Sequence, residues 1–226
     1  MKAVLDTSAL INILVGGGLT FFNLILSRYD GFLATSKLEK EYKRKLANIV
    51  KKPDERKNIE DQLNKFDIVR LPSEEVKLYY KTQNEFLTSL GKKVNLLSIV
   101  DAECLYMVKK GYADILISDD ISCWLVAGKE KINYSSSILE AYALNIEGRI
   151  NLTTFVKFAS TLFSTAGWKL VRGYKADIAL REYLKVVLKA IINSKDILKS
   201  SILKSDEEQI PQHLILTTIE NILGCD

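Results

Sequence analysis

The sequence has few of the residues that build histidine-rich metal sites and disulfide frameworks. A single histidine, His213, stands among 226 residues, which excludes a zinc site made from several histidines. The three cysteines, Cys104, Cys123 and Cys225, are widely spaced and form no CxxC pair, so we expect free thiols in a reducing compartment. Catalysis by this chain would therefore depend mainly on carboxylates, hydroxyls or lysines.

Proline is also scarce, and the two signs of charge nearly balance. Three prolines and a hydrophobic fraction of 47% exclude an extensively disordered chain. Lys and Arg number 32 against 28 Asp and Glu, and the resulting net charge of +4 does not by itself indicate a nucleic-acid partner. The excess is local, however, because residues 37–57 hold nine basic residues and four acidic ones.

The N-terminus resembles a signal peptide only superficially. Its apolar run through Val15 is interrupted by Asp6 and Asn12, and no small-residue cleavage site follows. We expect no stretch of about 18 uncharged apolar residues that would span a bilayer. The prediction is a cytoplasmic protein without a membrane partner.

Short apolar runs alternate with helical patterns over the first 135 residues. Strands are expected at 3–5, 32–35, 67–71 and 115–118, and residues 16–18, three glycines, are expected to form a turn between two helices. Strands that are apolar on both faces and alternate with helices favour a parallel sheet covered on both sides. The predicted fold class is therefore α/β, with three layers in which helices cover both faces of a central, mostly parallel sheet.

Beyond residue 138 the patterns are helical, over 138–146, 153–162, 175–192 and 211–223. We predict one α/β domain over residues 1–150 and an all-helical C-terminal extension over 151–226. The extension would pack on the α/β unit or serve assembly. A homodimer and a protein partner bound through these helices are both left open.

Acidic residues follow the predicted strands, at the sheet edge where open parallel sheets bind their ligands. They are Asp6, Glu39, Glu41, Asp101, Asp119 and Asp120. Each has a simpler role open to it: Asp6, and either Asp119 or Asp120, could cap the helices that follow, and Asp101 could complete a capping box with Ser98. Glu39 and Glu41 could pair with nearby lysines. Capping explains each acid separately, but not why they gather at one edge.

Several carboxylates in a small volume repel one another unless a cation neutralises them. Oxygen ligands select a hard divalent metal such as Mg²⁺ or Mn²⁺. Such a site leaves coordination positions for water and phosphate oxygens, which suits metal-assisted hydrolysis of phosphodiester bonds.

Four segments, taken in order, resemble the PIN-domain family of metal-dependent nucleases. They are VLDTSALIN at 4–12, TSKLEKE at 35–41, SIVDAECL at 98–105 and ADILISDD at 113–120, and they cover about the first 130 residues. The resemblance implies a metal site of Asp6, Glu41, Asp101 and Asp120, with Glu39 as the alternative to Glu41 and Asp119 as an assisting neighbour. It also implies supporting hydroxyls, for which Thr7, Ser8 and Ser118 are available.

The same resemblance implies an endonuclease that cuts RNA into products with a 5′-phosphate and a 3′-hydroxyl, with DNA left open as substrate. The basic residues Lys37, Lys40, Lys43, Arg44 and Lys45 would follow the phosphate backbone, or would simply form a solvated helix face. Three other functions stay open: a toxin ribonuclease of a toxin–antitoxin pair, a non-catalytic PIN-fold module that binds RNA or protein, and a haloacid-dehalogenase phosphatase. A phosphatase of that class needs a D-x-D motif, whereas Asp6 in this sequence is followed by Thr7 and Ser8.

Overall fold

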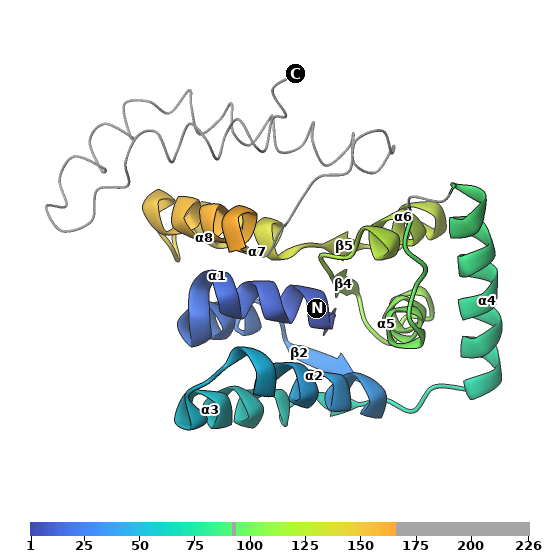
Figure 1. Cartoon of the computed structure of the whole chain (residues 1–226), viewed down its shortest axis with the longest axis horizontal. Helices are drawn as coiled ribbons and strands as arrows, with labels where there is room; N and C mark the ends of the chain where they lie inside the picture. The colour runs from blue at the N-terminus through green and yellow to red at the C-terminus, as the bar shows by residue number, and fades with distance from the viewer. Residues whose placement is uncertain (92–93, 166–226) are drawn as a thin grey trace, which may run out of the picture. The chain divides into compact units, whose positions relative to one another are not determined.

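Five short strands form one sheet in the computed structural model, which describes residues 1–91 and 94–165 (Figure 1). The strands are β1 (Lys2–Leu5), β2 (Gly31–Ala34), β3 (Asp67–Ile68), β4 (Ile115–Ile117) and β5 (Tyr134–Ser135). Neighbouring strands are parallel throughout, in the order β3-β2-β1-β4-β5. The predicted α/β class with a parallel sheet is confirmed.

Two details of the sheet differ from the prediction. The strand expected over 67–71 pairs only at Asp67 and Ile68, and β5 was not predicted. A strand of two residues leaves no apolar run or alternation by which a sequence pattern could detect it. The register places Val4 beside Leu33 and Leu116, so β1, β2 and β4 end at the same edge.

Helices connect the strands. They are α1 (Thr7–Leu26), α2 (Ser36–Ile49), α3 (Pro53–Leu63), α4 (Ser73–Ser89), α5 (Ile99–Lys109), α6 (Ile121–Glu130), α7 (Ser137–Ile146) and α8 (Leu152–Thr165). Several begin where the sequence predicts, with Pro53 at the first position of α3 and a capping box at Ser98 before α5. In α2 the residues Leu38, Tyr42 and Leu46, spaced four apart, form one buried apolar face.

The glycine turn expected at residues 16–18 is reduced to a kink inside α1. Only Gly18 leaves the helical region, with φ 66° and ψ −165°, a left-handed φ that glycine adopts without strain. Thr7–Leu26 carries no charged residue and is long and apolar enough to cross a membrane, so the expectation that no such stretch exists is wrong. A core helix meets the same criterion, and Leu10, Ile13 and Phe22 of α1 are fully buried.

The chain divides into two compact units, Met1–Glu140 and one that begins at Ala141. In the second unit the ring of Tyr142 packs against that of Phe155, with centroids 5.8 Å apart, and the Asn145 side chain donates to the carbonyl of Ile150. The predicted boundary at residue 150 stays a prediction. The helices expected at 175–192 and 211–223 lie outside the described residues.

Candidate metal centre

Asp6 lies where β1 gives way to α1, and its side chain is buried, with 3% of its surface exposed. Its Oδ1 accepts a hydrogen bond from the backbone N–H of Thr7 at 2.7 Å. Its Oδ2 accepts from the hydroxyls of Ser8 at 2.5 Å and Ser118 at 2.9 Å. The two serines therefore hold the carboxylate in one orientation, and both are among the supporting hydroxyls expected from the sequence.

The same two hydroxyls connect β1 to the end of β4. Ser8 Oγ accepts from the backbone N–H of Asp119 at 3.0 Å, and Ser118 Oγ accepts from that of Asp120 at 3.1 Å. Each serine thus donates to Asp6 and accepts from the backbone after β4. This network brings the acids that follow two adjacent strands into one region.

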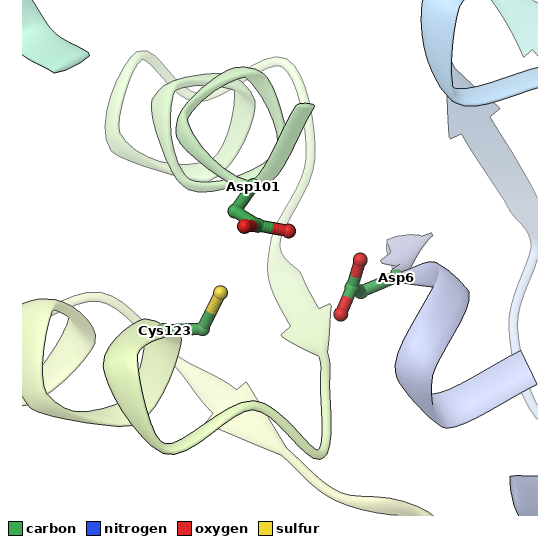
Figure 2. A group of neighbouring side chains, drawn as sticks. All are labelled: Asp6, Asp101 and Cys123. Carbon is green, nitrogen blue, oxygen red and sulfur yellow. The ribbon is translucent and has the colours of Figure 1, made fainter. Parts of the chain in front are cut away.

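Asp101 reaches this region from the first turn of α5. It forms the expected capping box with Ser98. The Asp101 Oδ2 accepts from the backbone N–H of Ser98 at 2.6 Å, and the Ser98 hydroxyl accepts from the backbone N–H of Asp101 at 3.1 Å. Figure 2 shows its carboxylate facing that of Asp6, with the thiol of Cys123 beside them. Asp6, Asp101 and Cys123 each offer one ligand atom, and the three atoms lie within 4.8 Å of one another.

The pKa of Asp6 reflects both its burial and the negative charges of the neighbouring carboxylates. Burial first, then the negative charge of Asp101 and more weakly that of Asp120, raise the pKa of Asp6 to about 7, against the lowering effect of the hydrogen bonds from Ser8 and Ser118. Burial also raises the pKa of Asp101, with further contributions from the charges of Asp120 and Glu41. The four predicted ligands thus act on one another electrostatically. In the absence of a cation, the group retains a proton near neutral pH.

Asp120 caps α6, since its Oδ1 accepts from the backbone N–H of Ser122 at 2.7 Å. The capping roles weighed from the sequence for Asp6, Asp101 and Asp120 are therefore all present, and they coexist with the clustering. Within residues 1–91 and 94–165, Oδ1 of Asp101 and Oδ2 of Asp120 accept no hydrogen bond. Each carboxylate can cap a helix with one oxygen and offer the other to a ligand.

The two glutamates of α2 differ. Glu39 pairs with Lys43 one turn later, with Oε1 and Nζ 2.6 Å apart. Glu41 is half-buried, has no ion pair or hydrogen bond among the described residues, and its charge contributes to the raised pKa of Asp101. Of the two glutamates, Glu41 is thus the one whose charge acts on Asp101, and its role as the second acid stays a prediction.

Asp119 has a different role from its neighbour. Its Oδ2 accepts from the Asn12 side chain at 2.7 Å and from the Ser137 hydroxyl, and its Oδ1 accepts from the Ser137 backbone N–H at 2.8 Å. These bonds join the end of β4 to α1 and to the start of α7. Thr7, the third expected hydroxyl, is buried, and its Oγ1 has no hydrogen-bond partner among the described residues.

Cys123 and Glu103 were not predicted as site residues. Cys123 was expected to be a free thiol. It is free and buried, and its position one turn after Asp120 is the signal that would have placed it near the acids. Glu103, two residues after Asp101, is buried beside Thr35, whose hydroxyl donates to it at 2.6 Å, and it also pairs with Lys37.

The remaining basic residues predicted to meet nucleic acid lie along α2. Lys40, Lys43 and Arg44 are exposed and Lys45 is half-buried, while Lys43 is engaged by Glu39. The structure thus places a basic helix face next to Glu41.

Comparison of the chain with protein-family models, curated proteins and solved structures finds no match. The fold and the site define an α/β protein with a five-stranded parallel sheet, in which the buried Asp6 at the sheet's carboxyl edge faces the half-buried Asp101.

Proposed function

We propose that this chain is a metal-dependent endonuclease with PIN-like α/β/α layering that hydrolyses phosphodiester bonds in RNA. The observation that carries the proposal is the pair formed by Asp6, at the carboxyl end of β1, and Asp101, in the first turn of α5, whose carboxylates face each other (Figure 2). Two like charges this close, one of them buried, repel each other, and a divalent cation between them offsets that repulsion.

The available donors suit such a cation. Asp101 and Asp120 each keep one carboxylate oxygen free of hydrogen bonds within the described part of the chain, and Glu41 keeps both. Oxygen donors of this kind fit Mg²⁺ and Mn²⁺, and the nearby thiol of Cys123 favours Mn²⁺ of the two, since softer ligands select transition metals.

In the proposed reaction, Asp6, Glu41, Asp101 and Asp120 hold one or two metal ions. A bound metal lowers the pKa of a coordinated water and neutralises charge that develops on the phosphate. Water oxygen bonds to phosphorus, the bond from phosphorus to the 3′ oxygen breaks, and the leaving oxygen takes up a proton. Ser8 and Ser118 keep Asp6 oriented by their hydrogen bonds, as outer hydroxyls commonly do for metal-binding carboxylates.

The test is cleavage of a generic single-stranded RNA by the full chain, with Mn²⁺, with Mg²⁺ and with EDTA. We expect cleavage that needs the metal and falls by about 100-fold or more in Asp6→Asn and Asp101→Asn. Asp30→Asn is a matched control, because Asp30 is exposed and pairs with the N-terminal amine at the opposite end of β1. Full metal-dependent activity in the Asp6→Asn, Asp101→Asn double variant would overturn the proposal.

The same experiment separates the proposed enzyme from the non-catalytic RNA-binding module that the sequence left open. A chain that binds RNA but does not cleave it in either metal would be such a module. The free carboxylate oxygens of Asp101 and Asp120 favour the enzyme, since a binding surface for RNA gains nothing from uncompensated negative charge.

A further inference from the structure

A second feature lies beside the acidic group: a pocket with a volume of about 570 Å³. Its walls come from the beginnings of α2, α4 and α5 and from the segment that follows β3. All of these elements belong to the first unit. The volume is within the range of sites that bind small molecules.

The strand register places this pocket next to Asp6. Since Val4 pairs with Leu33, Thr35 follows β2 just as Asp6 follows β1, and Thr35 lines the pocket. Adjacent strands are about 4.8 Å apart, so the pocket begins about one strand spacing from Asp6. Glu103, another lining residue, follows Asp101 by two positions on α5.

The lining is positively charged. Lys37, Arg70 and Lys77 contribute to it, against one acid, Glu103. Both oxygens of Glu103 are already engaged, by the Thr35 hydroxyl and by Lys37. Arg70 is exposed and has no ion pair among the described residues, and Lys77 pairs only with the exposed Glu74, an interaction that a ligand displaces at little cost.

The pocket also offers an apolar surface. Ile68, Leu71 and Ile99 line it, and Ile68 is 49% exposed although it lies in a strand. The backbone N–H groups at the first turns of α2 and α4 lie at the same walls, where a helix favours negative charge. Cations, helix starts and an apolar wall in one cavity match a ligand with an anionic part and a flat apolar part.

We propose that this pocket binds one unpaired nucleotide of the substrate strand, adjacent to the nucleotide whose phosphate is cut. Its phosphate pairs with Arg70 and Lys77, and its base lies against Ile68 and Leu71. This inference rests on the proposed nuclease function for the identity of the strand, and it adds a binding determinant outside the acidic group and the basic face of α2.

The first experiment measures binding of a fluorescent single-stranded RNA to the full chain in EDTA, where no metal-dependent cleavage occurs. We expect the Arg70→Ala, Lys77→Ala variant to bind about tenfold more weakly than the unmodified chain. The control is Lys65→Ala, Lys81→Ala, which removes the same charge from exposed positions outside the pocket and is expected to change affinity less than about twofold. Equal weakening in the two variants would mean a general charge effect and would overturn the inference.

A second variant tests the apolar wall without changing charge. Ile68→Trp fills part of the cavity, so we expect it to abolish the binding of a nucleoside monophosphate that titration calorimetry detects in the unmodified chain. Unchanged nucleotide binding in Ile68→Trp would overturn the inference. Cleavage is measured separately with Mn²⁺. If the chain binds RNA through Arg70 and Lys77 but does not cleave it, the pocket inference is supported and the proposed nuclease function is overturned.

Discussion

The hydroxyl of Ser118, at the end of β4, donates a 2.9 Å hydrogen bond to the carboxylate of Asp6, at the end of β1. Residues 112 positions apart are thereby fixed at one sheet edge. The same hydroxyl accepts from the backbone N–H of Asp120, so the direction of the Asp6 carboxylate and the start of α6 are set together.

Stability should depend on pH in the metal-free chain. The pKa of Asp6 rises from its ordinary 3.8 to about 7 on folding, and that of Asp101 rises as well. A raised carboxyl pKa means that the folded state binds the proton more tightly, so this contribution is present below about pH 4 and is lost as pH rises to about 7. We expect Tm in EDTA to fall across that window. Saturating Mn²⁺ should remove most of the fall at pH 7, and a Tm that Mn²⁺ leaves unchanged would contradict the prediction.

Neutralising either facing aspartate should stabilise the metal-free chain. Asp6→Asn and Asp101→Asn each remove one of two carboxylates that repel each other, which we expect to add about 1 kcal/mol or more, or roughly 2–4 °C in Tm at pH 7.5. Mn²⁺ should then raise Tm of the unmodified chain but not that of the variants. The control Asp30→Asn loses an exposed pair with the N-terminal amine and should not gain stability. Variants less stable than the unmodified chain in EDTA would show that capping outweighs repulsion.

The two glutamates of α2 should differ in their effect on metal binding. Glu41→Gln removes a half-buried carboxylate that acts on Asp101, whereas Glu39→Gln breaks only a pair with Lys43. We expect Glu41→Gln to weaken Mn²⁺ binding by about tenfold and Glu39→Gln by less than about twofold. Calorimetric titration measures both, and the reverse order would identify Glu39 as the second acid.

The thiol of Cys123 should make the centre sensitive to soft metals. Its sulfur lies within 4.8 Å of ligand oxygens of Asp6 and Asp101, and a thiolate binds Cd²⁺ far more strongly than Mn²⁺. We expect Cd²⁺ to compete with Mn²⁺ and to produce an ultraviolet thiolate-to-metal absorbance that disappears in Cys123→Ser. Cys104→Ser is the matched control, because Cys104 is equally buried but is not part of the group. An absorbance that persists in Cys123→Ser would place the thiolate elsewhere.

Local patterns were enough to locate most of the fold and the acids. The apolar runs before Asp6 and before Asp119 predicted β1 and β4, because central parallel strands are apolar on both faces. Ser98 and Asp101 predicted the start of α5, because a capping box depends only on residues three apart. β5 was not predicted, because its two residues are too few to form a sequence pattern and are recognised as a strand only by their pairing with β4.

Long-range relationships among the same residues were beyond sequence patterns. In sequence, Cys123 and Glu103 resemble ordinary helix residues. Only the packing of α5 against β1 and α6 places Cys123 next to Asp6 and Glu103 next to Thr35. The Thr7–Leu26 run carries no charge, although Asp6 directly precedes it and Asn12 lies within it. A run of this kind is identical in composition whether it lies in a protein core or in a bilayer.

By itself, the sequence determined which kinds of residue are available for chemistry: with one histidine, these are mainly carboxylates, hydroxyls and lysines. It also placed Asp6, Asp119 and Asp120 directly after apolar runs that form strands. Tertiary structure alone decided how those carboxylates meet. The parallel register of β1 and β4, together with the hydrogen bonds of Ser8 and Ser118, turns Asp6 toward Asp101 and buries it. Sequence spacing carries no information on how deeply a carboxylate is buried or on the distance between two oxygens that approach from different elements. Burial first, and then the nearby charge of Asp101, raise the pKa of Asp6.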